Sequence, residues 1–354
     1  MDLKNILIIG PDPEKKAAGI VTHMKNLLQY EVFDNAEVFD VGSINSKFKE
    51  NKTSYREIIK RLLILRKKIN KRKLEVIINI SLYVPSLYKL IAILFFIGNK
   101  AGNNINIFFH GGYATEKHKT VLSILNVVLR TNKNIKGLYF LSEIQKTGFS
   151  KYIKFDNINL YNNYSDSNNI IAKIPNRKYT FLFVGRLDES KGIIEAVKAV
   201  EILRESINKE FILHIVGDGP LLSYLNSYIV NNNLEDFIKL SGHLNNNQLN
   251  IAYASADFLI FPSYQEGFPY VYIESMRAGL PIICTRAGAL KRLIKDDYNG
   301  FHINMKDAFG LSEKMKFVIN NKINLKLNCY NEFKLYLSKS KGNEFYNELL
   351  KYNN

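Results

Sequence analysis

Short apolar runs alternate with amphipathic segments along the first half of the chain. The runs are rich in Ile, Val, Leu and Phe and end at Gly, Pro or Asn, a pattern that predicts buried strands. Between them apolar residues recur at helical spacing, as at Ile58, Leu62, Leu65 and Ile69. The expected strands are residues 5–10, 36–41, 76–81 and 105–109, and the expected helices are 20–30, 55–71 and 85–97. This alternation predicts a parallel sheet covered by helices on both faces.

A polar stretch rich in Asn and Ser interrupts the alternation, and we expect residues 166–178 to form a linker. A second alternation then begins, with strands expected at residues 179–185, 211–216, 237–241, 257–262 and 281–285 and helices at 193–206, 221–232 and 248–254. The sequence therefore predicts an α/β protein with two Rossmann-like domains, residues 1–165 and 179–325, which face each other across a ligand cleft. Residues 326–354 are expected to form helices that can pack back on the first domain.

Length and composition are consistent with two ordinary soluble-type domains. The chain has 354 residues, of which 46% are hydrophobic. Its two cysteines, Cys284 and Cys329, lie far apart and form no CxxC, and the start of the chain reads as a strand instead of an export signal. These features favour a reducing cytoplasm. The longest apolar stretch, residues 84–98, is too short to span a bilayer and contains Lys89, so a buried helix is expected.

The formal net charge of +16 is concentrated in the first half. Residues 1–170 carry 26 Lys and Arg against 14 Asp and Glu. This excess indicates an anionic partner, which could be a lipid surface, a nucleic acid or a phosphate-bearing substrate. An AT-rich genome, which favours Lys, Asn and Ile codons, would explain part of the excess. The most basic segment, residues 47–73, has an amphipathic helical centre, which suits an anionic membrane surface or simply a solvated helix face.

Two candidate sites follow strands of the second half. After FLFVG come Arg186 and Lys191, and a glycine and a helix follow the lysine. Two cations beside a helix N-terminus suit a diphosphate, although a solvated loop would look similar. After FILHIV comes GDGP, where Gly217 would let a ligand approach the backbone, although a plain turn is the simpler interpretation.

The segment QEGFPYVYIES carries two glutamates at the end of another expected strand. Glu266 lies in the loop, and a helix is expected to begin at Pro269 or Tyr270, so that Glu274 lies about one turn inside it. Carboxylates accept hydrogen bonds from hydroxyl groups, in which sugars are rich. Because the helix looks largely buried, Glu274 is expected to need a partner. Together with the two cations, the pair predicts a nucleotide-sugar site.

Two further candidates lie in the first half. Gly19 stands before a helix and after the first strand, but the segment is not GxGxxG and lacks the dinucleotide fingerprint. His110 ends a strand and is followed by two glycines, so its side chain could project into the cleft. A lone histidine is more often structural, and the strand-end position is what favours a site role.

Taken together, these motifs resemble glycosyltransferase family 4, a family of retaining enzymes with the GT-B fold. The resemblance covers most of the chain and is densest between residues 181 and 303. The family's glutamate pair is matched by EGFPYVYIE, its diphosphate loop by GRLDESKG, and the next strand end by IVGDGP. The segment SGHLNNNQL, which includes Leu244, resembles the part that holds the nucleotide base through backbone contacts.

The resemblance implies roles for these residues. Arg186 and Lys191 would neutralise the departing diphosphate and Glu274 would bind the ribose. Glu266 and the backbone of Gly267 and Phe268 would hold the donor sugar.

In the first half, His110 resembles a histidine near the transferred sugar, and Gly19 belongs to a loop under the phosphates. Departures are Ala18, where a second glycine is common, Asn163, where the family often has glycine after Asn162, and the large Arg277.

The chain contains no D-x-D motif, the usual ligand of a catalytic metal in many glycosyltransferases. We therefore expect no metal and no cofactor, with the positive field at the leaving group supplied by side chains and helix N-termini.

The predicted function is a retaining glycosyltransferase of the hexosyltransferase type. It is expected to move a sugar from a UDP-sugar or another nucleotide sugar to a glycan or lipid-linked acceptor in bacterial capsule, O-antigen or lipopolysaccharide synthesis. A cytoplasmic protein bound peripherally to the inner membrane face is expected. The alternatives are a GT-B-fold sugar-nucleotide epimerase and a basic nucleic-acid-binding protein. The second lacks any helix-turn-helix, zinc or RNP-type pattern, so no nucleic-acid partner is expected.

Overall fold

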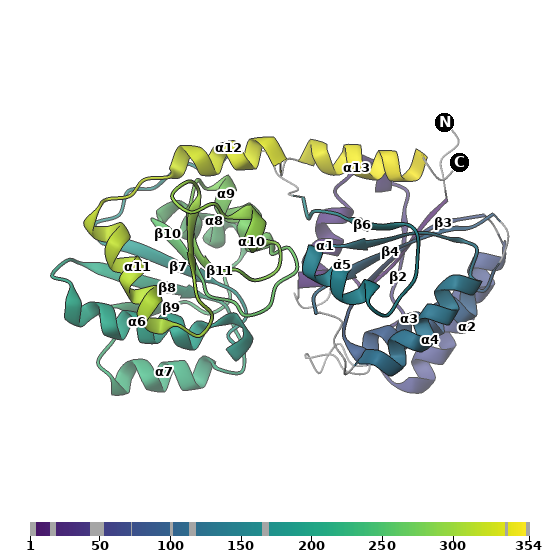
Figure 1. The fold of residues 1–354 in the computed structure, drawn as a ribbon, viewed down its shortest axis with the longest axis horizontal. Helices are drawn as coiled ribbons and strands as arrows, with labels where there is room; N and C mark the ends of the chain where they lie inside the picture. The colour runs from purple at the N-terminus through teal and green to yellow at the C-terminus, as the bar shows by residue number, and fades with distance from the viewer. Residues whose placement is uncertain are drawn as a thin grey trace. The chain divides into compact units, whose positions relative to one another are not determined.

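The computed structural model describes residues 5–14, 19–42, 53–71, 73–99, 102–112, 118–164, 170–336 and 339–351. The chain divides into two compact units (Figure 1). The first unit holds Met1–Asp166 and Lys339–Asn354, and the second holds Ser167–Ser338. The basic residues Lys47, Lys49, Lys52 and Arg72 lie outside the described residues, as does Ala18.

The first unit is built on a six-stranded parallel sheet with the order β2-β1-β3-β4-β5-β6. Its strands are β1 Ile6–Ile9, β2 Glu37–Phe39, β3 Glu75–Ser81, β4 Asn104–His110, β5 Ile135–Phe140 and β6 Ile158–Leu160. Its helices are α1 Gly19–Leu27, α2 Tyr55–Lys71, α3 Val84–Ile97, α4 Lys119–Thr131, α5 Glu143–Ser150 and α13 Lys339–Lys351, with a short 3-10 turn η1 at Glu31–Phe33.

Helices cover both faces of this sheet because strand residues on both faces are apolar. One face packs against α2, α3, α4 and α5 through a core that includes Leu65, Leu90, Leu125 and Phe149. On the other face, α13 contributes Tyr346, whose ring centroid lies 5.9 Å from that of Phe108 in β4. Such double coverage is what a parallel sheet requires.

The second unit repeats the architecture with the strand order β12-β11-β10-β7-β8-β9, again parallel throughout. Its strands are β7 Tyr179–Val184, β8 Phe211–Val216, β9 Ile238–Leu240, β10 Phe258–Phe261, β11 Ile282–Thr285 and β12 Gly300–Ile303. Its helices are η4 Glu189–Lys191, α6 Ile193–Ser206, α7 Leu222–Asn231, α8 Asn246–Ser255, α9 Tyr270–Arg277, α10 Leu290–Leu293, α11 Ala308–Asn320 and α12 Lys326–Tyr336.

The main core of the second unit lies on the face covered by α6, α7 and α11. Phe181, Phe183 and Phe258 of the sheet are fully buried there. The opposite face meets α8, and α12 packs on α9. Residues 170–178 precede strand β7 in the chain and run along the second unit. There the amide of Ile174 donates to the carbonyl of Ala254 at 2.9 Å.

The predicted two parallel α/β sheets are confirmed, and the strands expected from the sequence match to within two residues. The predicted helix in residues 84–98 is also confirmed as α3, of 14 residues. Among the helices of the described residues, none has both the length and the apolar character that a bilayer crossing needs. The expected cleft between the two domains stays a prediction.

Candidate functional site

Loops from four strands meet at the carboxyl edge of the second unit's sheet. The order β11-β10-β7-β8 makes the residues after these strands neighbours, although they are far apart in the chain. The amide of Leu187 donates to the carbonyl of Asp218 at 3.0 Å, and the amide of Tyr264 donates to the carbonyl of Ser190 at 2.9 Å. These backbone bonds tie the loop after β7 to those after β8 and β10, the place where ligands bind in such sheets.

At the centre of this edge Lys191 forms an ion pair with Glu266. The distance from Lys191 Nζ to Glu266 Oε1 is 2.6 Å, and the side chains are 25% and 9% exposed respectively. The hydroxyl of Ser263 donates to the same carboxylate oxygen at 2.6 Å. A charge-assisted hydrogen bond in so sheltered a place is stronger than a surface pair. The sequence predicted both residues for the site, and the structure brings them into contact.

Arg186, the second predicted cation, lies on the same loop but forms an ion pair with a different acid, Asp188. Its Nε donates to Asp188 Oδ2 at 2.9 Å, and the hydroxyl of Ser190 donates to Asp188 Oδ1 at 2.5 Å. Asp188 therefore fixes the loop from within and holds the arginine close to the edge. Asp188 was not predicted for the site, although it stands between the two cations in GRLDESKG.

Two glycines allow the loops of this edge to approach one another. Gly217 has a φ of +145°, and a Cβ there would lie 1.8 Å from the carbonyl oxygen of Gly185. Gly288 has a φ of +54°, and a Cβ there would lie 2.0 Å from the carbonyl oxygen of Glu266. Gly217 was predicted for the site. Gly288 was missed, although the AGA segment after an apolar strand is a signal for a close backbone approach.

Glu274 lies in α9, where the sequence placed it, and has the partner that its burial demands. The hydroxyl of Tyr253 in α8 donates to Glu274 Oε2 at 2.7 Å. Burial, and next the nearby Glu274 carboxylate, raise the pKa of Tyr253 well above its ordinary value. Tyr253 therefore stays protonated and remains a donor that orients the carboxylate.

The remaining predicted donor-binding residues of the second unit lie around the start of α9 and beyond β9. The carbonyl of Gly267 accepts from the amide of Ala289 at 2.9 Å. Phe268 is buried, and its ring packs edge-on to Tyr272 at 6.0 Å between centroids. Leu244 follows β9 and lines a groove beside α8.

His110, the candidate of the first unit, ends β4 within a buried polar cluster. Its Nε2 lies 2.8 Å from Asn79 Oδ1, and its Nδ1 lies 3.0 Å from the hydroxyl of Tyr161. The ring of His23 is 4.3 Å away between centroids, and His23 Nδ1 lies 3.2 Å from Asn163 Oδ1. These contacts suit a neutral His110 that donates to Asn79 through Nε2 and accepts from Tyr161 at Nδ1.

Both histidines of this cluster are held neutral. Burial lowers the pKa of His23 to about 4, an effect that hydrogen bonds to Asn163 and Asn79 only partly oppose. Burial, and next the neighbouring His23, lower the pKa of His110 well below its ordinary value. The predicted Gly19 is the first residue of α1, the helix that carries His23. The other members of the cluster, His23, Asn79 and Tyr161, were not predicted from the sequence.

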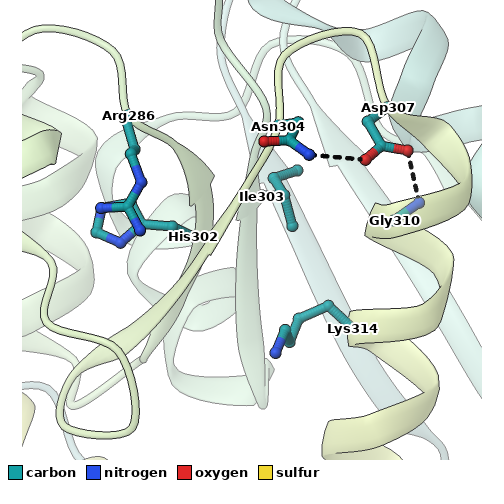
Figure 2. A pocket seen from close by; sticks show the side chains of 7 residues that line it. All are labelled: Arg286, His302, Ile303, Asn304, Asp307, Gly310 and Lys314. Atoms are coloured by element: carbon teal, nitrogen blue, oxygen red, sulfur yellow. Dashed lines mark hydrogen bonds between the residues drawn. The ribbon is translucent and has the colours of Figure 1, made fainter.

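A separate hollow of about 220 Å³ lies beyond β11 and β12 (Figure 2). Its polar groups are already engaged. Asp307 Oδ1 accepts from the amide of Gly310 at 2.7 Å, Arg286 pairs with Asp296 at 3.4 Å, and Lys314 lies over the ring of Phe301. We assign it no ligand. Among the described residues, no cluster of three or more His, Cys, Asp or Glu is placed to hold a metal ion.

The fold and the site define a class of protein: two parallel α/β units, one of which gathers paired charges and glycines at the carboxyl edge of its sheet. Comparison with known proteins is consistent with this architecture. Residues 166–334 match the family of glycosyl transferases group 1. An uncharacterized glycosyltransferase of Methanocaldococcus jannaschii is 31% identical over 204 residues, which is 53% of this chain and 54% of the relative.

Two further matches extend the comparison. The UDP-Gal:alpha-D-GlcNAc-diphosphoundecaprenol alpha-1,3-galactosyltransferase of Escherichia coli is 29% identical over 174 residues, 48% of this chain and 44% of that protein. The crystal structure of Anabaena HepE in complex with UDP-glucose superposes with a TM-score of 0.76 at 16% identity, over 98% of this chain and 99% of the other. The chain spans about half the length of the curated relatives it matches.

The chain has the GT-B fold, and residues 166–334, just under half of it, match the group 1 glycosyl transferases. The fold that the resemblance implied is therefore confirmed, and the family match supports the resemblance over residues 166–334.

Proposed function

We propose that the protein is a retaining glycosyltransferase that takes a UDP-sugar as donor and a glycan or lipid-linked glycan as acceptor. The observation that carries the proposal is the 2.6 Å pair of Lys191 and Glu266 at the carboxyl edge of the second unit's sheet. This pair places a cation suited to phosphate beside a carboxylate suited to hydroxyl groups, at the position where α/β sheets bind ligands.

The pair has a simple use in sugar transfer. As the bond from the anomeric carbon to the diphosphate breaks, the electron pair goes to the diphosphate, and positive charge develops on the sugar. Lys191 and Arg186 would stabilise the negative charge on the diphosphate, and Glu266 would hold a sugar hydroxyl. The acceptor hydroxyl then bonds to the anomeric carbon and gives its proton to an oxygen of the departing diphosphate. Each cation is paired with an acid, so a diphosphate would compete with an existing ion pair for each of them.

Two matches support the choice of substrates. The Escherichia coli relative is named for UDP-Gal as donor and a diphosphoundecaprenol-linked sugar as acceptor. Anabaena HepE was crystallised with UDP-glucose. A UDP-sugar is therefore our proposed donor, a lipid-linked glycan our proposed acceptor, and bacterial surface polysaccharide synthesis our proposed setting.

The first test measures UDP-sugar turnover in the wild type, in Lys191→Ala and in a control variant. Loss of one preorganised charge at a leaving group lowers kcat by about 10²–10³-fold. We expect such a loss in Lys191→Ala, with normal circular dichroism. The control is Lys209→Ala, which removes an exposed lysine on the loop before β8 and should leave turnover unchanged.

Equal turnover in both variants would contradict the role of Lys191. Mass analysis of the product distinguishes transfer from epimerisation, because an epimerase converts the donor and adds no sugar to an acceptor. Thermal shifts with UDP, GDP and ADP identify the nucleotide, since a ligand of the native state raises its stability.

We also propose that the first unit attaches the enzyme to the inner face of the cytoplasmic membrane. Helices α2, α3 and α4 contact one another in series and lie side by side on one face of the sheet (Figure 1). Large apolar side chains are exposed on all three, among them Leu63, Phe95 and Val127, with Phe95 74% exposed. Exposed apolar side chains gathered in this way mark an interaction surface.

Cations accompany these apolar side chains. Lys60, Lys67, Lys119 and Arg130 are exposed on α2 and α4. Near an anionic membrane each Lys or Arg contributes on the order of 1 kcal/mol, and the apolar side chains can enter the headgroup region. The combination favours an anionic lipid surface over a purely solvated helix face, and it would bring the enzyme to a lipid-linked acceptor.

Sedimentation with vesicles of phosphatidylglycerol or phosphatidylcholine tests the attachment. We expect binding to the anionic vesicles only, weakened by salt and by the double variant Phe95→Ser/Val127→Ser. Leu327→Ser, which removes an exposed leucine of α12 in the second unit, is the control and should bind like the wild type. Absence of salt-sensitive binding to the anionic vesicles would refute the proposal.

A further inference from the structure

A groove of about 470 Å³ lies in the second unit between α8 and strands β7, β8 and β9. The larger apolar side chains that line it are Ile212 of β8, Leu244 after β9 and Ile251 of α8. Its volume falls in the range of small-molecule sites. Of the residues that line it, Leu244 alone is among the predicted donor-binding residues, and the charged residues of the proposed transfer reaction lie elsewhere.

Three cations also line the groove. Arg177, Lys178 and Lys239 are exposed there, and none of them forms an ion pair within the described part of the chain. No Asp or Glu is among the described residues that line the groove. The groove therefore presents uncompensated positive charge together with apolar side chains.

The segment that carries two of these cations is anchored on the second unit. Just before them, Lys173 Nζ donates to Asp257 Oδ1 at 2.8 Å, and Asn176 Nδ2 donates to Thr180 Oγ1 at 3.1 Å. These bonds hold the backbone of residues 173–178 against the start of β7. The cations thus lie on a fixed segment, which lowers the entropy cost of binding an anion.

The floor of the groove adds neutral hydrogen-bonding groups. His214 Nε2 lies 2.8 Å from the hydroxyl of Ser241. Burial, and next the positive charge of Lys239, lower the pKa of His214 to about 4. The imidazole is therefore neutral at physiological pH and can report on an anion, whose arrival would favour its protonated form.

This groove is distinct from the proposed diphosphate site. Arg177 and Lys178 precede β7, whereas Arg186 and Lys191 follow it. A six-residue strand spans about 20 Å. One donor diphosphate cannot contact both ends of β7.

We propose that this groove is a second anion site, which binds a small phosphate monoester that carries an apolar group. The phosphate would contact Arg177, Lys178 and Lys239, and the apolar group would lie against Ile212 and Ile251. The proposal is independent of the transfer reaction, so either can fail alone.

The test follows His214 by NMR in protein labelled at histidine, with phenyl phosphate as the probe and saturating UDP present to fill the donor site. His214→Gln assigns the resonance. We expect saturable shifts of His214, a rise in its pKa, and binding about tenfold weaker for inorganic phosphate or phenol alone. Arg177→Gln/Lys178→Gln/Lys239→Gln should weaken phenyl phosphate binding by tenfold or more on the same scale of about 1.4 kcal/mol per decade.

The matched control is Lys198→Gln/Lys209→Gln/Lys334→Gln, which removes the same charge from exposed positions elsewhere on the second unit. It should bind phenyl phosphate like the wild type. Three results would overturn the proposal: no shift of His214, displacement of phenyl phosphate by UDP, or equal weakening in the control.

Discussion

Acid should destabilise the first unit through its buried histidine pair. His23 and His110 lie with their rings 4.3 Å apart, and both are buried. The pKa of His23 is lowered to about 4 in the folded chain, against 6.5 for an ordinary histidine. Between these values the unfolded chain binds a proton that the folded chain does not. Stability is therefore expected to fall as the pH falls from about 6.5 toward 4.

The size of the effect follows from the two pKa values. At pH 5 the unfolded histidine is almost fully protonated and His23 is about nine-tenths neutral, so His23 alone costs about 2 kcal/mol relative to neutral pH. His110 acts in the same direction, because its pKa is also lowered. The total loss in the first unit should therefore exceed about 2 kcal/mol, a large part of a typical domain's stability.

Hydrogen exchange of amides in β3 and β4 measures this loss in the first unit alone, apart from His214 of the second. The variant His23→Gln keeps a side-chain donor for Asn163 but cannot titrate. It should be less stable at pH 7.5 than the wild type, yet its loss between pH 7.5 and pH 5 should be smaller by about 2 kcal/mol. His243→Gln, at an exposed histidine, is the control. An equal acid loss in the wild type and in His23→Gln would refute the reasoning.

Three further predictions concern the second unit. Gly288→Ala should lower stability by about 1–3 kcal/mol and abolish the thermal shift with UDP, because its Cβ would meet the carbonyl of Glu266. The control is Gly98→Ala, which has a φ of +65° and open space around its Cβ and should lower stability less. Tyr253→Phe should raise KM for the donor with little change in kcat, because Glu274 loses its orienting hydrogen bond; an unchanged KM would contradict this. Turnover should persist in EDTA, since the proposed charge stabilisation uses side chains, and complete loss on chelation would exclude that account.

Much of the fold could be predicted because the apolar pattern determines the elements. Runs such as YTFLFV and FILHIV are too short and too β-branched or aromatic for helices, and they became β7 and β8. Strands β5, β6 and β12 were not placed. Strand β6 has three residues, none of them fully buried, and so gives little apolar signal.

The candidate site was predictable in its members but not in its contacts. The pattern shows that Lys191 and Glu266 follow strands, and both do. Lys191 and Glu266 are 75 residues apart in the sequence. Their 2.6 Å contact depends on β10 lying next to β7 in the sheet. Strand order is decided by how helices cross the sheet, and alternation alone does not encode it.

The histidine cluster could not be predicted from the sequence for a different reason. Its members come from four separate segments, and each looks ordinary alone. Asn79 gave a signal, because an amide in the middle of the apolar run EVIINIS must find a partner once the strand is buried. The sequence does not say that the partner is His110, which lies opposite Ser81 on the neighbouring strand.

The neutrality of this cluster bears on the role that the resemblance implies for His110, beside the transferred sugar. Positive charge develops on the sugar as the donor bond breaks, and a protonated imidazole nearby would oppose it. Burial, and next His23, lower the pKa of His110 well below its ordinary value, while Asn79 and Tyr161 occupy its two ring nitrogens. The ring is therefore arranged to hold a fixed, neutral position, not to exchange protons. The cations that the proposed reaction would use are instead carried by the second unit, where Arg186 and Lys191 each form an ion pair with an acid.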